Sequence, residues 1–220
     1  MIPKLHYISQ GTTPKEHLEN IQQACQSGAE LVQLRLKKYS EKKILKTAKE
    51  AREITAHFQT RLIINDHYKI AKEVKADGVH LGKSDSSPTE ARKHLYAWQI
   101  IGGTANTLED CKNLLDQKVD YIGLGPFRFT KTKDNLSPVL GSNGYLTILE
   151  ELKTETPIIA IGGIEIEDIL DIMMTRVHGI AMSGAITRNF NTIPKINTFL
   201  KAPSTNEQVY KLDDDKNNIS

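Results

Sequence analysis

The chain has 220 residues, 39% of them hydrophobic and 25% charged, with a formal net charge of +2. These values allow one domain with a sizeable core, exclude a chain that is disordered throughout, and argue against a large nucleic-acid surface. Because the chain has neither an apolar run near the ~20 residues that span a bilayer nor a signal-peptide pattern at its start, we expect a cytoplasmic protein that does not bind membranes.

Strand and helix signals alternate along the chain. Short apolar runs predict strands at 5–9, 31–36, 61–64, 78–81, 99–104, 121–125, 158–161 and 179–183. Helical spacing and Ser/Thr-Pro starts predict helices at 14–25, 41–57, 68–74, 89–95, 108–116, 145–153 and 165–174, and a last one from 185 or 194 to 200. Such alternation favours a parallel sheet, and eight units favour closure into a single (β/α)8 TIM barrel over residues 1–202, with an open doubly wound sheet as the alternative. The polar segment 203–220 is expected to be a disordered tail.

Polar and aliphatic residues alternate along the second predicted strand and just beyond it. Gln33, Arg35 and Lys37 occupy one face, since strand side chains have period two. In a barrel that face points to the axis, where burying a cationic side chain costs free energy unless an anion pairs with it. The pattern therefore indicates an anionic ligand; an edge strand with one wet face is the alternative.

The third and fourth predicted strands end in an amide and two carboxylates. Asn65 and Asp66 follow one strand, and Asp85 follows the next. Ligands bind at the carboxyl ends of parallel strands, and two carboxylates suit Mg²⁺, which usually binds together with substrate phosphates. Alternatively, Asp66 caps a helix and Asp85 closes a Ser-rich turn.

Three later loops carry anion-binding signals. The segment 126–143 has no clear element and contains Thr130, Thr132 and Lys133, which could hold an anionic substrate or belong to an ordinary polar loop. Gly162-Gly163 and Ser183-Gly184 leave the last two strands, where barrels often bind phosphate; tight turns are the compatible alternative. None of the seven histidines shows a catalytic pattern, so packed or exposed structural roles are expected.

Five motifs occur in order along these strand ends. They are Gln33-Leu-Arg35-Leu-Lys37, Leu62-Ile-Ile-Asn65-Asp66, Ala76-Asp-Gly-Val-His-Leu-Gly82 with Asp85, Gly125-Pro126 with Thr130-Lys-Thr132-Lys133, and Ala160-Ile-Gly-Gly-Ile164. Together they resemble the thiamine-phosphate synthase (thiamine-phosphate pyrophosphorylase) family over about residues 5–200. The resemblance implies a TIM barrel and a transferase that joins 4-amino-2-methyl-5-hydroxymethylpyrimidine diphosphate to 4-methyl-5-(2-hydroxyethyl)thiazole phosphate, giving thiamine phosphate and pyrophosphate, with Mg²⁺ and a dissociative step.

The resemblance also implies roles for individual residues. It assigns the pyrimidine diphosphate to Gln33, Arg35, Lys37, Asn65, Thr104 and Lys133, the thiazole phosphate to Thr130, Thr132, Gly163 and Ser183, Mg²⁺ to Asp66 and Asp85, and catalytic roles to Arg35 and Lys133. The expected partners are the two small phosphorylated substrates; the oligomeric state stays open, with a homo-oligomer as one option. A thiazole tautomerase of a related barrel and a non-catalytic sensor of thiamine precursors are the alternative functions.

Overall fold

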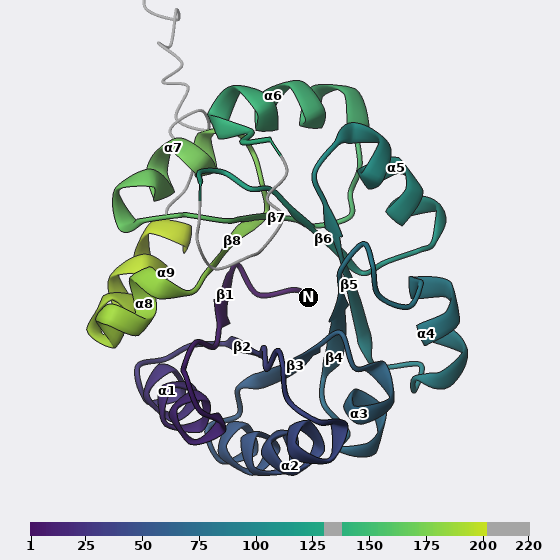
Figure 1. Cartoon of the computed structure of the whole chain (residues 1–220). Helices are drawn as coiled ribbons and strands as arrows, with labels where there is room; N and C mark the ends of the chain where they lie inside the picture. Colours follow the sequence, from purple (N-terminus) through teal and green to yellow (C-terminus); the bar gives the residue numbers. More distant parts are fainter. Residues whose placement is uncertain (130–137, 202–220) are drawn as a thin grey trace, which may run out of the picture.

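The computed structural model describes residues 1–129 and 138–201, and its strands close into a parallel barrel in sequence order (Figure 1). The strands are β1 (Leu5–Ile8), β2 (Leu31–Leu34), β3 (Arg61–Asn65), β4 (Gly78–Leu81), β5 (Ile100–Ala105), β6 (Tyr121–Leu124), β7 (Ile158–Ile161) and β8 (Gly179–Met182). The predicted (β/α)8 barrel is confirmed, and the open sheet is wrong, because β8 pairs with β1 in the register Leu5↔Ile180.

The helices form a ring outside the strands (Figure 1). They are α1 (Pro14–Gln26), α2 (Glu41–His57), α3 (Tyr68–Glu73), α4 (Pro88–His94), α5 (Leu108–Asp116), α6 (Gly141–Leu152), α7 (Ile169–Met174), α8 (Gly184–Arg188) and α9 (Ile193–Lys201), with 3-10 turns η1 (Ile166–Asp168) and η2 (Phe190–Thr192). Several begin at the caps that the sequence indicates: Thr13, Ser40 and Ser87 each accept a hydrogen bond from a first-turn backbone N–H. None of the helices in the described ranges has the length and apolarity needed to cross a bilayer.

Some predicted boundaries need correction. The second strand ends at Leu34 rather than at residue 36, because the backbone N–H of Arg35 donates to the Ser9 side chain instead of to a neighbouring strand. The helix predicted at 165–174 is a 3-10 turn followed by α7, and the last predicted helix is two helices joined by η2. The predicted tail, 203–220, lies outside the described residues.

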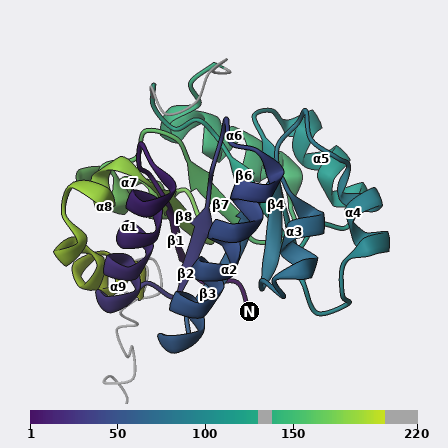
Figure 2. The ribbon, with the colours of Figure 1, turned by 60° about the horizontal axis from the view of Figure 1, so that its bottom comes forward.

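Side-chain alternation along the strands produces two apolar layers. The outer layer, between strands and helices, includes Val32, Leu34 and Leu36. The inner layer lies within the barrel and contains Ile8, Tyr121, Ile159 and Ala181. A filled interior leaves ligand binding to the ends of the barrel. Seen from the side, the N-terminus lies at the amino ends of the strands, away from the mouth at their carboxyl ends (Figure 2).

Candidate active site

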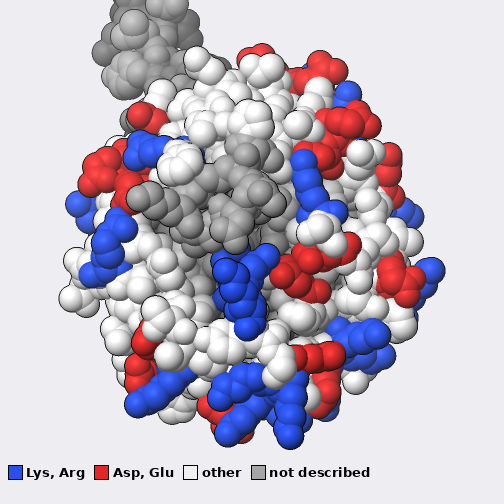
Figure 3. All heavy atoms as spheres, in the orientation of Figure 1, with Lys and Arg blue, Asp and Glu red and all other residues white. Residues whose placement is uncertain are grey.

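The mouth of the barrel carries charges of both signs. In the orientation of Figure 1, the carboxyl ends of the strands open toward the viewer. Figure 3 shows a group of Lys and Arg side chains beside a group of Asp and Glu near the centre of this face. Charges of opposite sign at the carboxyl ends of barrel strands are typical of a site for an anion and a cation bound together.

Gln33 and Asn65 lie side by side at the carboxyl ends of β2 and β3. Gln33 pairs with Ile63 in the strand register, so Gln33 and Asn65 point to the same, inner face of the barrel. Their exposed fractions are only 5% and 8%. Gln33 Nε2 donates to Asn65 Oδ1 over 3.1 Å, and this contact orients the Asn65 amide. The two predicted residues are therefore brought together.

The other polar atom of Asn65 finds no hydrogen-bond partner in the part of the chain that the structure describes. Within the described residues, Asn65 Nδ2 is the buried side-chain nitrogen or oxygen that makes no hydrogen bond. An unsatisfied buried donor costs about 1–3 kcal/mol, and such groups mark places where a further acceptor is expected. An anionic oxygen at the mouth would satisfy this amide.

Asp66 does not cap the following helix. Its backbone is left-handed, with φ 65°, and its N–H donates to His80 of β4 over 2.9 Å. The N-cap of α3 is His67, which makes no side-chain cap bond. The capping alternative is therefore wrong, and the Asp66 carboxylate is turned toward the mouth, where Lys37 Nζ lies 3.6 Å from Oδ2.

Asp85 closes the turn after β4 and also lies against Asp66. Its Oδ2 accepts the Gly82 N–H over 2.7 Å, which closes the turn after β4, and a Cβ on Gly82 would lie 2.8 Å from the same oxygen. Its carboxyl group also meets that of Asp66. Burial, a hydrogen bond with Asp85 and repulsion from its charge raise the pKa of Asp66 to about 6, against the opposing charges of Lys37 and Arg35. The turn and the carboxylate pair coexist.

The carboxylate pair fits Mg²⁺. No cluster of three or more metal-binding side chains occurs within 1–129 and 138–201, which argues against a closed protein cage. Mg²⁺ keeps several waters and needs only one or two carboxylates with substrate phosphates. A cation between Asp66 and Asp85 would also offset the repulsion that raises the Asp66 pKa.

The predicted cations lie just past the end of β2. Lys37 is half-exposed in its contact with Asp66, and the Arg35 side chain is partly buried. The turn is held by Ser9, whose hydroxyl accepts the Arg35 N–H over 3.1 Å and lies 2.7 Å from His17 Nδ1. Sequence reasoning missed this Ser9–His17 support, because neither residue belongs to a recognisable motif.

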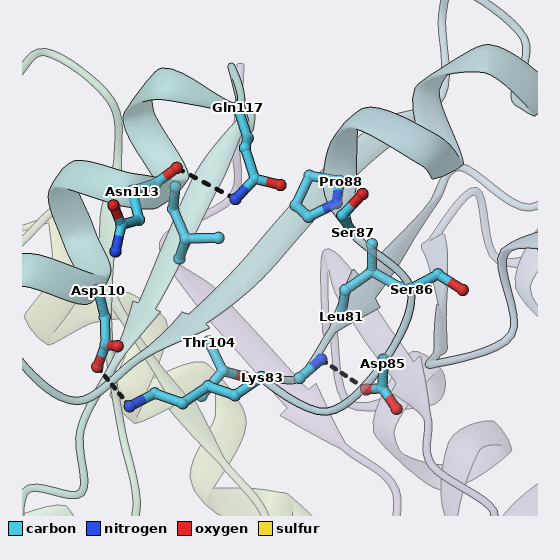
Figure 4. A pocket seen from close by; sticks show the side chains of 12 residues that line it. Leu81, Lys83, Asp85, Ser86, Ser87, Pro88, Thr104, Asp110, Asn113 and Gln117 are labelled. Atoms are coloured by element: carbon cyan, nitrogen blue, oxygen red, sulfur yellow. Dashed lines mark hydrogen bonds and ion pairs between the residues drawn. The ribbon is translucent and has the colours of Figure 1, made fainter.

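A cavity of about 340 Å³ lies where β4 and β5 end, between the loop after β4 and the helices α4 and α5 (Figure 4). Asp85 and Thr104 both line it, and a 2.5 Å ion pair between Lys83 and Asp110 lies across one side. Thr104 points into the barrel from β5, and its Oγ1 lies 2.9 Å from His80 Nε2. The sequence singled out Thr104 but assigned His80 no role in the site.

Gly163 and Ser183, which are predicted for the thiazole phosphate, lie elsewhere on the mouth. Gly163 follows β7 with φ +71°, and a Cβ there would lie 2.8 Å from the carbonyl oxygen of Arg128, at the start of the loop after β6. Ser183 donates its hydroxyl to the Ile8 carbonyl over 2.9 Å, so this side chain ties β8 to β1. Thr130, Thr132 and Lys133 lie outside the described residues, and their assignments stay predictions.

Comparisons with known proteins identify the family of this chain. Residues 5–186 match the model of a family described as thiamine monophosphate synthase. The thiamine-phosphate synthase of Flavobacterium johnsoniae is 48% identical over 192 residues, covering 86% of this chain and 91% of the relative, and that of Bacteroides fragilis is 45% identical over 83% and 91%. A solved thiamine phosphate pyrophosphorylase from Pyrococcus furiosus superposes with a TM-score of 0.78 at 26% identity, covering 90% of this chain and 97% of that one. The chain belongs to the thiamine monophosphate synthase family, whose members are transferases.

Proposed function

We propose that this chain condenses 4-amino-2-methyl-5-hydroxymethylpyrimidine diphosphate with 4-methyl-5-(2-hydroxyethyl)thiazole phosphate, releasing pyrophosphate and forming thiamine phosphate. The observation that supports this most directly is Asn65 Nδ2, which lies beside the Asp66–Asp85 pair and has no hydrogen-bond partner within residues 1–129 and 138–201. A buried N–H donor needs an acceptor such as an anionic oxygen, and the neighbouring carboxylates need a cation. A magnesium diphosphate supplies both.

The proposed roles of the residues follow from their chemistry. Asn65 Nδ2 donates to a diphosphate oxygen, while Arg35 and Lys37 hold the rest of the negative charge. Asp66 and Asp85 would hold Mg²⁺, which when bound offsets the charge on the leaving diphosphate. Gly163 and Ser183 are assigned to the thiazole phosphate together with Thr130 and Thr132, and Lys133 to the diphosphate, by family likeness.

The proposed bond changes are a substitution at the pyrimidine methylene carbon. The carbon–oxygen bond breaks first, and its electron pair leaves with pyrophosphate. The electron-rich aminopyrimidine stabilises the cation that remains, and the thiazole ring nitrogen supplies the pair for the new carbon–nitrogen bond. Holding both substrates in one mouth supplies much of the rate, because a bimolecular step becomes effectively unimolecular.

The test is an assay of the purified chain with both substrates, with Mg²⁺ or with a chelator, measuring thiamine phosphate and pyrophosphate. Equal amounts of both products are expected with Mg²⁺, and turnover should fall when the pyrimidine carries an electron-withdrawing substituent. Asp85→Asn should lose most turnover, whereas Asp116→Asn, at an exposed carboxylate on α5, should keep it.

The outcomes also separate the alternatives. No thiamine phosphate under any condition would sink the proposal. Isomerisation of a thiazole carboxylate phosphate without any need for the pyrimidine would favour the tautomerase. Tight binding of both precursors without turnover would favour a sensor.

A further inference from the structure

A column of three hydrogen-bonded side chains runs up the inside of the barrel to the mouth. Tyr121 of β6 lies deepest, and its hydroxyl oxygen is 2.9 Å from His80 Nδ1. The other nitrogen of His80, Nε2, lies 2.9 Å from Thr104 Oγ1. Tyr121 and His80 are 2% and 6% exposed, while Thr104, near the carboxyl end of β5, is partly exposed. The column therefore connects the buried interior with the site.

Two glycines make room for this column. Gly102 of β5 faces the Tyr121 ring, and a Cβ there would lie 2.1 Å from Tyr121 Cζ. Gly123 of β6 faces His80, and a Cβ there would lie 3.0 Å from His80 Cε1. Any larger residue at Gly102 would displace the tyrosine ring. The barrel interior is thus shaped to hold both rings. This fit indicates that their hydrogen bond is a built feature of the barrel.

The direction of the hydrogen bonds follows from the buried phenol. Burial raises the pKa of Tyr121, so its oxygen keeps a hydrogen that must be donated. Among the described residues, the acceptor found for it is His80 Nδ1. If Nδ1 instead carried the hydrogen, the Tyr121 hydrogen would lack that acceptor, a loss of about 1–3 kcal/mol in a buried site. His80 is therefore the neutral tautomer with its hydrogen on Nε2.

This tautomer determines whether the Thr104 hydroxyl donates or accepts a hydrogen bond at the mouth. His80 Nε2–H donates to Thr104 Oγ1, so the Thr104 hydroxyl must direct its own hydrogen away from His80. We propose that Tyr121 and His80 are positioning residues that make Thr104 a hydrogen-bond donor to an unprotonated ring nitrogen of the aminopyrimidine. The column then rejects rings that present C–H or N–H at that place. This inference rests on the proposed function for the identity of the ring.

The tautomer can be observed without turnover. Nitrogen-15 NMR of histidine-labelled, substrate-free protein should show His80 with Nε2 protonated and Nδ1 unprotonated, the signal being assigned by its loss in His80→Gln. Tyr121→Phe removes the donor to Nδ1 but keeps the ring, so the Nδ1-protonated form should become populated. An Nδ1-protonated His80 in the unaltered protein would overturn the inference, whether or not the chain makes thiamine phosphate.

Kinetics test the consequence for the substrate. Tyr121→Phe should raise KM for the pyrimidine diphosphate by about tenfold, the equivalent of one hydrogen bond, and leave KM for the thiazole phosphate unchanged. The matched control is Tyr145→Phe, because Tyr145 is also fully buried but donates to the Leu124 carbonyl over 2.5 Å. Equal KM values in the two variants would overturn the positioning role.

A substrate analogue tests the specificity. The unaltered enzyme should discriminate by about tenfold against a pyrimidine diphosphate analogue in which the contacted ring nitrogen is a C–H group. Thr104→Val should abolish that discrimination, and discrimination that survives in Thr104→Val would contradict the inference. If the unaltered protein binds neither substrate, the proposed function fails. The NMR result still decides the direction of the hydrogen bonds between Tyr121, His80 and Thr104.

Discussion

Asp66 and Asp85 leave different strands, yet their carboxyl groups come within hydrogen-bond reach of each other. Burial, a hydrogen bond with Asp85 and repulsion from its charge raise the pKa of Asp66 to about 6. The nearby Lys37 and Arg35 oppose this shift without cancelling it. Asp66 therefore holds a proton at mildly acidic pH that a divalent cation can replace.

The first prediction concerns competition between Mg²⁺ and that proton. At pH 8, Mg²⁺ at ten times its dissociation constant should stabilise the protein by about 1.4 kcal/mol, which raises Tm by about 3–6 °C. At pH 5 the stabilisation by the same Mg²⁺ concentration should fall to about 0.4 kcal/mol, because Asp66 is then mostly protonated and the proton competes with the cation. Thermal melts with and without Mg²⁺ measure this. Asp66→Asn should abolish the shift and Asp116→Asn should keep it; an equal shift at both pH values would contradict the assignment.

The second prediction concerns the metal-free protein. The folded-state pKa of Asp66 lies above its ordinary value of 3.8, so the folded state binds the proton more tightly. This carboxyl therefore destabilises the fold progressively as pH rises from about 3.8 to about 6, and the loss is complete above that range. Asp66→Asn should therefore stabilise the chelated protein by about 2 kcal/mol at pH 8 and leave it unchanged below pH 4. Asparagine also tolerates the left-handed backbone at this position.

Urea titrations of both proteins in chelator at several pH values test this second prediction. Burial lowers the pKa of His6 to about 3, so the unfolded state binds its proton more tightly and both proteins should lose stability as pH falls below about 6.5. Because His6 is common to both, its contribution cancels in the difference. An Asp66→Asn protein less stable than the parent at pH 8 would show that the carboxylate is well compensated.

Alternation of strand and helix signals was enough to predict the barrel, since each unit carries its own local signals. The end of the second strand was not predictable in this way. Polar and aliphatic residues go on alternating to Lys37, and Leu36 is buried like a strand residue, but pairing stops at Leu34 where Ser9 takes the next N–H. Alternation of polar and aliphatic residues indicates which side chains are buried. The end of a strand depends instead on where its backbone hydrogen bonds to the neighbouring strand stop.

The candidate site was predictable only where one strand end carries its own chemical signal. Asn65, Asp66 and Asp85 are short-range signals of this kind. The role of His80 is different, because it depends on Gly102 and Gly123 leaving space from two other strands. Inward-facing glycines on adjacent barrel strands could have pointed to such a space, but only after the register was known.

The third prediction concerns the unpartnered amide. Asn65→Asp keeps an oxygen that can accept from Gln33, but replaces the Nδ2 donor with another negative charge near Asp66. kcat/KM for the pyrimidine diphosphate should fall by about 10- to 100-fold or more, because a hydrogen bond to a charged group is worth about 1.5–3 kcal/mol. Asn191→Asp makes the same change at an exposed position and should have no effect. Equal kinetics in both variants would remove Asn65 from the diphosphate site.

The fourth prediction compares alanine substitutions at two glycines whose backbone is left-handed. Gly28 and Gly163 both have positive φ, at +91° and +71°, so alanine should cost each about 1–2 kcal/mol of stability. A Cβ on Gly28 would meet nothing within 4 Å, whereas one on Gly163 would lie 2.8 Å from the Arg128 carbonyl oxygen and 2.9 Å from that of Phe129. Those two residues lead directly into Thr130, which family likeness assigns to the thiazole phosphate.

Gly163→Ala should therefore weaken binding of the thiazole phosphate in addition to lowering stability. Its methyl group should push back the backbone just before Thr130, and KM for the thiazole phosphate should rise about tenfold or more while KM for the pyrimidine diphosphate changes little. Gly28→Ala should lower Tm by a similar backbone cost and leave both KM values unchanged. Steady-state kinetics well below the Tm of each variant make the comparison. If the two variants lose stability alike and neither alters KM, the loop after β7 acts only as a tight turn, and the thiazole phosphate must bind elsewhere on the mouth.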